Sequence, residues 1–304
     1  MAISLKPISE QVVVVTGASS GIGLATAFEA AKRGAKVVLA ARSQGALNDA
    51  VTAIRQAGGV AVAAIADVSR REDVERIAEV ALRELGRVDT WVNNAGLSTY
   101  GRLEQVQDGD ARRVFDVNFW GAVNGMLVAL PILRQQGAGA LINVGSEVSE
   151  AVAPLQGIYT ASKHALKAYT DVLRIELMEA GDERVSITLI QPTAVDTPFA
   201  QHARNYMTVE PKLPDPQIDP EHVAEAILKA AQQPERDVKV GGTAVLKTTM
   251  AKVAPSLSDK MATKVVDQQQ SDEPPRDPEG TLYKPGEAGQ KRGSVLRGEA
   301  PAGH

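Results

Sequence analysis

The sequence predicts an α/β fold of the doubly wound type, in which helices cover both faces of a parallel sheet and make three α/β/α layers. Two observations lead to this prediction. Short apolar runs rich in β-branched residues alternate, up to residue 192, with longer segments whose apolar residues recur at helical spacing. Each of the first three helical segments also ends at a glycine, a common place for a helix to stop. Because parallel neighbours need a right-handed crossover, this alternation implies repeated β-α-β units.

The strand candidates are apolar along nearly their whole length, as strands buried on both faces should be. They cover residues 11–15, 36–41, 60–66, 89–95, 140–146 and 185–192. The first three helices are expected between them, over residues 23–34, 45–58 and 71–86. The resulting order of elements is that of a Rossmann-like sheet.

Length and composition narrow the function classes. The 304 residues allow one large domain or two small ones, and 44% apolar with 23% charged residues is ordinary for a globular protein. A net charge of −4 and a pI near 5.7 provide no basic surface for nucleic acid, so we expect no nucleic-acid partner.

Cysteine and histidine usage argues against several kinds of site. The chain has no cysteine, which excludes disulfides, thiol nucleophiles and thiolate metal sites. Its four histidines lack the paired spacing of metal ligands, so no metal is expected. The apolar run at residues 12–15 is too short for a signal-peptide core or a membrane span, and we therefore expect a cytoplasmic location.

The organisation of the chain changes after about residue 234. We expect a dinucleotide-binding and catalytic domain over residues 1–245 and an amphipathic extension over residues 246–266. Residues 267–304 are rich in proline, glycine and charge, with few large apolar side chains. Such a composition predicts an extended or disordered tail.

The extension at 246–266 has one apolar face and a positive bias from four lysines. Its apolar positions are Leu246, Met250, Val253, Leu257, Met261 and Val265. This pattern fits an interfacial helix on an anionic membrane, or a helix packed on its own domain or on a partner subunit. Pro255 argues against one continuous helix, because proline removes a helical hydrogen bond.

The stretch TGASSGIG, residues 16–23, follows the first strand directly and opens the first helix. Its glycines permit a tight turn and let a pyrophosphate approach the backbone, while the helix N-terminus offers free N–H groups. Taken alone, the glycines could form only a strand-to-helix turn. Within the first β-α-β unit they predict a dinucleotide site.

Five ordered motifs together resemble the classical form of the short-chain dehydrogenase/reductase superfamily over residues 8–245. TGASSGIG is similar to its cofactor fingerprint, and NNAG (93–96) to the motif that closes its fourth strand. The family's four catalytic residues are matched by Asn118, Ser146, Tyr159 and Lys163. QPTAVDTP (191–198) is similar to the family's segment after the sixth strand, except that Thr193 replaces the usual glycine.

The pair Tyr159 and Lys163 has a direct chemical interpretation. A free tyrosine has a pKa of about 10, and Lys163 lies one helical turn along the same face. We expect this ammonium, with the charge of an oxidised nicotinamide, to lower the pKa of the phenol. Tyr159 would then act as general acid in reduction and general base in oxidation, with Ser146 donating a hydrogen bond to the substrate oxygen. The resemblance further implies that Lys163 binds the nicotinamide ribose and that Asn118 holds a water of the proton relay.

The end of the second strand bears on cofactor choice. A site specific for NAD would place Asp or Glu there, to bond the ribose 2′-hydroxyl, but this chain has Ala41 and then Arg42. A guanidinium can bind a 2′-phosphate, so NADP(H) is expected rather than NAD(H). With the resemblance, the expected cofactor-binding residues are Gly17, Ser19, Ser20, Gly21, Ile22, Gly23, Arg42, Asp67, Val68, Asn94, Ala95, Gly96, Tyr159, Lys163, Pro192, Val195 and Thr197.

The expected partner is a small-molecule substrate, namely a secondary alcohol or its ketone or aldehyde. Ligands bind beyond the carboxyl ends of the strands in open α/β sheets, so specificity should come from residues 97–103, 147–158 and 194–220. His202, Arg204 and Tyr206 in the last segment either line the pocket or belong to an exposed lid.

Two further expectations concern partners and an alternative function. The helical segments at 110–136 and 159–180 resemble those through which family members pair, and an outer apolar stripe with Phe115, Leu127 and Leu173 would suit a homo-oligomer. The alternative to an enzyme is a dinucleotide-binding sensor or scaffold with little turnover, which would be expected to lose Tyr159, Lys163 or Ser146.

Overall fold

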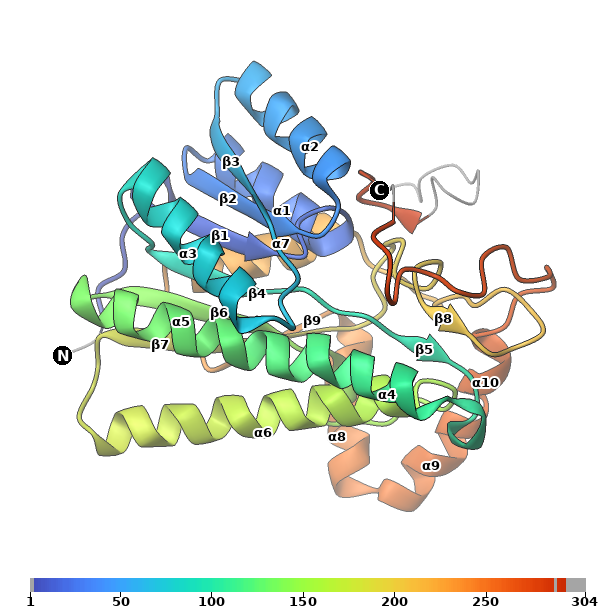
Figure 1. Cartoon of the computed structure of the whole chain (residues 1–304). Coiled ribbons are helices and arrows are strands. Elements are labelled where there is room, and N and C mark those ends of the chain that lie inside the picture. The colour runs from blue at the N-terminus through green and yellow to red at the C-terminus, as the bar shows by residue number, and fades with distance from the viewer. Residues whose placement is uncertain (1–2, 287–288, 294–304) are drawn as a thin grey trace.

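A computed structural model describes residues 3–286 and 289–293, and within these ranges seven parallel strands form one twisted sheet in the order β3-β2-β1-β4-β6-β7-β9 (Figure 1). The strands are β1 (Val12–Thr16), β2 (Lys36–Ala41), β3 (Val60–Ile65), β4 (Thr90–Asn93), β6 (Gly139–Val144), β7 (Val185–Pro192) and β9 (Asp237–Val240). The main helices are α1 (Gly21–Lys32), α2 (Gln44–Gln56), α3 (Arg71–Leu85), α4 (Asp108–Phe115), α5 (Gly121–Gln135), α6 (Gly157–Glu179) and α7 (Pro220–Ala230). The doubly wound, three-layer prediction is confirmed.

The six predicted strands are all present, but the sequence analysis missed an edge strand and a separate two-stranded pair. The edge strand β9 was missed because it is short and its residues are only half-buried, so its sequence lacks the apolar run of a central strand. A separate pair, β5 (Thr99–Tyr100) and β8 (Arg204–Asn205), joins loops far apart in the chain. Two-residue strands are set by tertiary contact and leave no periodic signal.

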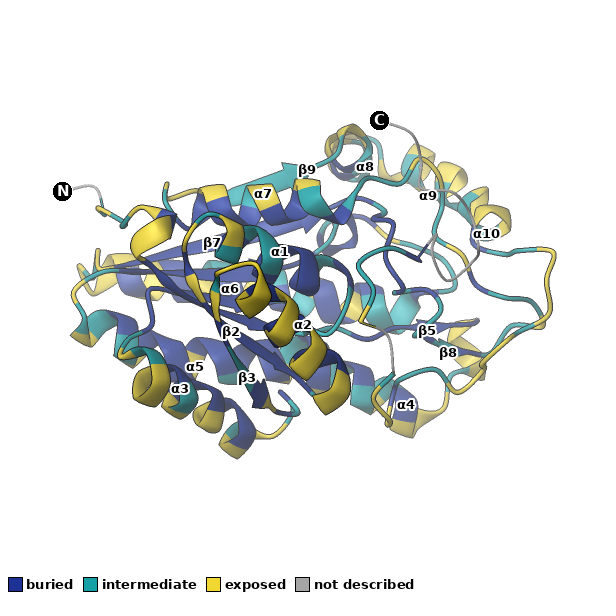
Figure 2. Ribbon diagram, turned by 90° about the horizontal axis from the view of Figure 1, so that it is seen from above, coloured by how far each residue is buried: buried dark blue, intermediate teal, exposed yellow. Residues whose placement is uncertain are grey.

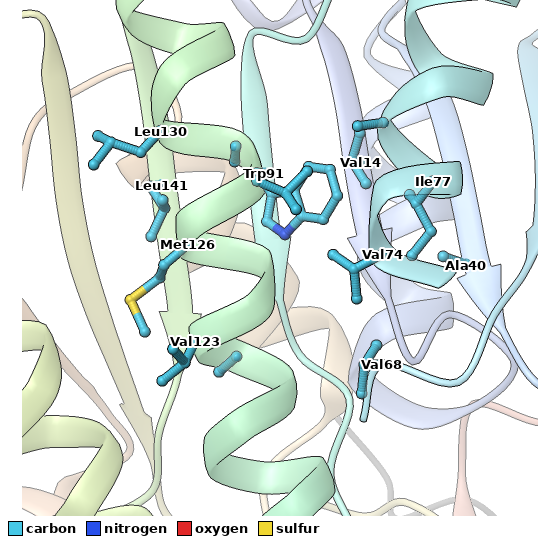
Figure 3. Close-up of a cluster of buried hydrophobic side chains, with 14 of the residues drawn as sticks. Val14, Ala40, Val68, Val74, Ile77, Trp91, Val123, Met126, Leu130 and Leu141 are labelled. Carbon is cyan, nitrogen blue, oxygen red and sulfur yellow. The ribbon is translucent and has the colours of Figure 1, made fainter. Parts of the chain in front are cut away.

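Two apolar cores lie on opposite faces of the sheet. Helices α1, α2 and α7 pack on one face, and α3, α5 and α6 on the other. Figure 2 shows the inner strands buried, the edge strand β9 half-buried and the outer faces of the helices exposed, which is the pattern that amphipathic helices produce. Figure 3 shows Trp91 of β4 between side chains of α3 and α5, and its indole N–H donates to Asn93 Oδ1 at 2.8 Å. The buried ring is thus both packed and hydrogen-bonded.

Helices α4 and α5 form one continuous run interrupted by a π-helical turn, η3 (Asp116–Trp120). By length and composition the run Asp108–Gln135 could cross a membrane, but 61% of its most apolar window is buried inside the protein. It is therefore a core helix of this domain. Single π turns often accompany functional sites, and this one contains Asn118.

The C-terminal extension folds into three short helices, α8 (Gly242–Val253), α9 (Pro255–Thr263) and α10 (Val265–Gln268). Pro255 is the first residue of α9, where its missing N–H removes no helical bond, so the chain divides where its sequence indicated. Helix α8 begins before residue 245, so the domain boundary expected there falls inside a helix.

The described part of the tail lies against the domain. Leu282 is 1% exposed, Thr281 N donates to His202 O at 2.8 Å, and Asn205 N donates to Pro278 O at 2.9 Å. Residues 271–286 form neither helix nor strand, and residues 294–304 of the predicted tail lie outside the described residues. An extended backbone is thus held in place by side-chain burial and by hydrogen bonds to a distant loop.

Candidate active site

One cavity of about 570 Å³ opens at the carboxyl ends of the parallel strands. This is where the winding direction of the sheet reverses, between β1 and β4, and where doubly wound folds bind their ligands. Of the described residues expected at the cofactor, all but Gly23 line this cavity, and so do Ser146, Tyr159 and Lys163. The loops that follow β1, β2, β3, β4, β6 and β7 bring these residues together.

Glycine is required for close packing in the turn after β1. Gly17 has φ of +66°, and a Cβ there would lie 2.7 Å from the Cα of Ala95. A Cβ on Gly23 would lie 2.3 Å from Gly17 O and 2.5 Å from Asn94 Nδ2. Gly23 therefore lets helix α1 pack closely on the turn. It does not line the cavity, whereas its neighbours Gly21 and Ile22 do.

Asn94 ties the end of β4 to the end of β1. Its Nδ2 donates to Thr16 O at 2.9 Å, and Asn94 N donates to Thr16 Oγ1 at 3.0 Å. These bonds hold the glycine turn beside Ala95 and Gly96, and both loops line the cavity. Asn94 contributes to the cavity chiefly as a brace between two loops.

Ser146, Tyr159 and Lys163 meet at the floor of the cavity. Ser146 follows β6 and caps a short 3-10 turn, η4 (Glu147–Ser149), while Tyr159 and Lys163 lie in the first two turns of α6. Lys163 Nζ donates to Val144 O at 2.8 Å and lies 5.7 Å from the centroid of the Tyr159 ring. A proton donor and a hydroxyl therefore face the same space, with a buried ammonium behind them.

The electrostatics of Tyr159 differ from the sequence-based expectation. Burial raises the pKa of Tyr159 to about 12, Ser146 opposes this rise by hydrogen bonding, and the Glu147 carboxylate adds to it. Burial also lowers the pKa of Lys163 to about 8. In the protein alone, desolvation of the phenolate outweighs the hydrogen bond with Ser146, and the Lys163 ammonium is bound to the Val144 carbonyl. The phenol is thus held protonated at neutral pH.

Asn118 lies behind the site rather than on the cavity wall formed by the described residues. Its Oδ1 accepts from Leu97 N at 2.7 Å, and its Nδ2 donates to Leu97 O at 2.9 Å and to Ser162 Oγ at 3.0 Å. The side chain is 1% exposed and fully hydrogen-bonded. In this geometry it positions the loop after β4 and the helix α6 that carries Tyr159.

Arg42 is held by the tail. Its Nη2 donates to Thr281 O at 2.5 Å and its Nη1 to Leu282 O at 3.2 Å. Burial, and then the nearby charge of Arg113, lower the pKa of Arg42. No carboxylate forms an ion pair with Arg42 among the described residues, so this half-buried guanidinium is suited to an anionic ligand.

Asp67 is already paired with Arg113. Arg113 Nη2 donates to Asp67 Oδ2 at 2.5 Å, and Arg113 Nε donates to Leu282 O at 3.1 Å. Burial acts to raise the pKa of Asp67, but hydrogen bonds from Arg113 and Ser69 outweigh it and lower the pKa. Leu282 O of the tail thus accepts hydrogen bonds from both Arg42 and Arg113. Further along the tail, Gln290 O accepts a hydrogen bond from Gly21 N at 3.0 Å.

Thr193, which stands where the resemblance leads one to expect glycine, links three segments. Its Oγ1 donates to Glu147 Oε2 at 2.9 Å and lies 2.5 Å from Thr243 Oγ1 of α8. Lys247 of α8 donates to Glu147 Oε1 at 2.6 Å. The departure from glycine therefore attaches the C-terminal helices to the loop that carries Ser146.

Of the three residues after β7 that were considered for the pocket, one lines the cavity and two do not. His202 lines the cavity, and burial, followed by the charge of Arg42, lowers its pKa. Arg204 and Tyr206 instead bind Asp110, with Tyr206 OH donating to Asp110 Oδ2 at 2.5 Å. These two residues brace the loop against α4.

Sequence reasoning missed the part of the wall built by the C-terminal region. Residues from α8, α9 and α10, together with Thr281, Pro285 and Gly286, line the cavity. The apolar periodicity of 246–266 was visible in the sequence, but its partner surface was not. The composition of the tail predicted little structure, and a single Leu282 in that segment was too weak a signal.

Comparisons with known proteins agree with this geometry. The family model described as short chain dehydrogenase matches residues 11–207. Over 296 residues the chain is 43% identical to the uncharacterized oxidoreductase YxnA of Bacillus subtilis, which covers 96% of this chain and 83% of that protein. It is 36% identical over 222 residues to 11-beta-hydroxysteroid dehydrogenase 1A of Arabidopsis thaliana, covering 71% of this chain but only 62% of that relative.

Two solved structures are similar over most of the chain. A short chain dehydrogenase/reductase from Burkholderia phymatum in complex with NAD is 28% identical, with a TM-score of 0.75 over 90% of this chain and 99% of that one. An alcohol dehydrogenase from Thermococcus sibiricus complexed with 5-hydroxy-NADP is 30% identical, with a TM-score of 0.65 over 76% of this chain and 94% of that one. Both cofactor types therefore occur among similar folds.

Proposed function

The chain belongs to the short-chain dehydrogenase/reductase family of oxidoreductases, and from this premise we propose that it interconverts an alcohol and the corresponding ketone or aldehyde with NADP(H). The observation that carries the proposal is the meeting of Tyr159 and Ser146 in one cavity, backed by the buried Lys163. A nicotinamide dinucleotide, when bound, supplies or accepts the hydride.

The chain's own residues would perform the proton chemistry. In reduction, the Tyr159 hydroxyl gives its proton to the carbonyl oxygen, and the pair of electrons left on the phenol makes a phenolate. Ser146 donates a hydrogen bond to the same oxygen, where negative charge develops. Oxidation runs these steps in reverse, so Tyr159 takes the hydroxyl proton. Lys163 lies close enough to stabilise the phenolate that either direction requires.

NADP(H) is favoured over NAD(H) by the end of β2. The residues there are Ala41 and Arg42, so neither of them offers a carboxylate to bind a ribose 2′-hydroxyl. Two N–H groups of Arg42 bind the tail, and its other N–H groups can donate to a 2′-phosphate. Apart from Gly23, the residues expected at the cofactor fit a dinucleotide, since they line one continuous cavity from the glycine turn to Tyr159.

The test is a panel of alcohols, ketones and aldehydes assayed with all four forms of the two cofactors, following nicotinamide absorbance. Turnover with NADPH or NADP⁺ exceeding that with NADH or NAD⁺ supports the proposal. A sensor or scaffold would bind NADPH yet turn over none of the panel, and that result would overturn the enzymatic assignment.

A homo-oligomer is also proposed, on the outer faces of α5 and α6. The large apolar side chains exposed there are Leu127, Val172, Ile175 and Met178, together with Trp120 at the end of η3. The expected stripe was partly wrong, because Leu173 points inward and is buried in the core, whereas Leu127 is exposed. Large apolar side chains exposed on neighbouring helices are typical of an interface.

Static light scattering at micromolar concentration measures the assembly. The wild-type chain should give at least twice the mass of one chain, and Ile175→Lys with Met178→Lys should lower it. Val245→Lys, on an exposed apolar position of α8, serves as the control. A wild-type mass of one chain would show that this surface does not self-associate under those conditions.

A further inference from the structure

We propose that the substrate is a bulky, uncharged and largely apolar alcohol or ketone, and that helices α8–α10 form the wall that selects it. This inference rests on the proposed oxidoreductase function, because it concerns the part of the same cavity that lies beyond Tyr159. It names a substrate class from the side chains that surround the reacting group.

Apolar side chains from three separate parts of the chain surround this half of the cavity. The loop after β6 contributes Val148, Ala151 and Val152, and the loop after β7 contributes Phe199 and Leu213. The C-terminal helices contribute Leu246, Met250, Met261, Ala262 and Val265. Cavities that bind small apolar ligands have such a lining with few polar groups.

Phe199 defines the surface next to the reacting oxygen. Its ring lies with its centroid 5.2 Å from that of Tyr159, at an interplanar angle of 60°. A carbonyl group that accepts the Tyr159 proton would therefore have an aromatic face beside one of its substituents. An apolar chain or ring would gain contact with that face, whereas a charged group would lose hydration there.

Several of the lining side chains are exposed to the cavity and its mouth. Val152, Leu246 and Met261 are among the large apolar residues that the fold leaves exposed. An apolar ligand that covers these side chains removes their surface from water, which makes binding more favourable. Methionines suit such a site because their flexible side chains adapt to ligand shape.

The charges in this half of the cavity largely cancel. Glu147 is buried and binds Lys247 at 2.6 Å, so these two opposite charges offset each other. Lys264 also lines the cavity, but it is exposed. The positive groups Arg42 and Lys163 belong to the part expected to hold the cofactor. An anionic substrate would meet Glu147 beside the reacting group and would find no buried cation among the described residues of this wall.

The selecting wall is attached to the catalytic loop. Lys247 and Lys252 of α8 bind Glu147 and Glu150 at 2.6 Å and 2.5 Å, and Thr243 lies against Thr193. Because Glu147 follows Ser146 directly, the apolar wall keeps a set position relative to the hydroxyl that contacts the substrate. The distance between the apolar wall and Ser146 can therefore select substrates by size.

The experiment compares a homologous series of uncharged ketones with keto acids of equal chain length, using NADPH. We expect kcat/KM to rise roughly two- to fourfold for each added methylene until the cavity is filled. A terminal carboxylate should lower kcat/KM at equal length by about a hundredfold or more. Thermal stabilisation of the NADPH complex by non-reactive alkanes of the same lengths gives a readout independent of turnover.

Two variants of α8 form a matched pair. Met250→Ala should reduce the gain per methylene and lower kcat/KM for long ketones by about tenfold, with a smaller loss for short ones. Val253→Ala changes a residue of the same helix that is 79% exposed and does not line the cavity, so it should behave as wild type.

The outcomes separate the two proposals. Turnover that favours small or anionic carbonyl compounds would overturn the substrate class while leaving the oxidoreductase function intact. Equal effects of Met250→Ala and Val253→Ala would remove α8 as the selecting wall. An absence of turnover with every compound and both cofactors would overturn the proposed function, and the substrate class with it.

Discussion

The two walls of the cavity are held in different ways. The wall with the glycine turn, Ser146, Tyr159 and Lys163 is built at the ends of central strands and on α6, where ladder and helix hydrogen bonds position each residue. The wall formed by α8–α10 and the tail is held by a few ion pairs and by carbonyl contacts to distant side chains. In the functions proposed above, the first wall transfers protons, whereas the second selects the substrate.

This difference suggests how the protein separates chemistry from selectivity. Groups that transfer protons need a rigid geometry, which the sheet and α6 provide. Groups that recognise ligands can sit on segments attached through side chains, because those attachments can vary without disturbing the sheet. Variants of the first wall should therefore change turnover, and variants of the second should change ligand preference.

The largest effect is expected from Tyr159→Phe. This change removes the proton donor and leaves the ring beside Phe199, so kcat should fall by about a hundredfold or more while NADPH affinity stays close to wild type. Steady-state kinetics and NADPH fluorescence titration measure the two quantities. Tyr169→Phe, on the same helix but outside the cavity, is the control. Retention of more than about a tenth of wild-type kcat would refute the general-acid role.

A change of cofactor preference is expected from Arg42→Ala combined with Ala41→Asp. The double variant removes a guanidinium and adds a carboxylate, so the ratio of the dissociation constants for NADPH and NADH should shift toward NADH by roughly ten- to a hundredfold. Turnover with the preferred cofactor should change much less. Lys32→Ala, at an exposed position of α1, should leave the ratio unchanged. An unaltered ratio in the double variant would show that Arg42 does not contact a 2′-phosphate.

The pH dependence tests the first wall again. Burial lowers the pKa of Lys163 to about 8, so the ammonium that supports Tyr159 is lost as pH rises through that value. Tyr159, with a pKa raised to about 12 by burial, stays protonated over this range. The rate of reduction should therefore fall above pH 8 by about tenfold per pH unit.

Rate profiles from pH 6 to 10 for wild type and Lys167→Met provide the measurement. Lys167 lies one turn further along α6 and pairs with Asp171, so its variant should keep the wild-type profile. A wild-type rate that stays level up to pH 10 would mean that the Lys163 proton is not needed.

The smallest effect concerns the second wall and the tail. Leu282→Ala should loosen the segment whose carbonyls hold Arg42, and so weaken NADPH binding by about three- to tenfold with less change for NADH. Lys284→Ala, at an exposed neighbouring position, is the control. Equal weakening of both cofactors by Leu282→Ala would assign the tail a general structural role instead of one in positioning Arg42.

The sequence by itself determined the central part of this protein. Continuous apolar runs predicted the five inner strands and the edge strand β3, because a strand between two layers of helices must be apolar on both faces. TGASSGIG, Ser146, Tyr159 and Lys163 could be placed because each stands at the end of a strand or on one face of a helix. Tyr159 and Lys163 share a helical face by their local spacing, whereas the glycine turn and Ser146 were placed beside them by the doubly wound topology.

The tertiary structure alone decided the rest. The contact of Arg42 with Leu282 joins residues 240 positions apart, and the link from Glu147 to Lys247 spans 100 positions. Leu173 proved to be buried, and β9 formed from residues that are only half-buried. Desolvation of Tyr159, which raises its pKa against the hydrogen bond with Ser146, depends on everything packed around it. Local periodicity carries no information on which distant surfaces meet, and burial, ion pairing and pKa values follow from that meeting.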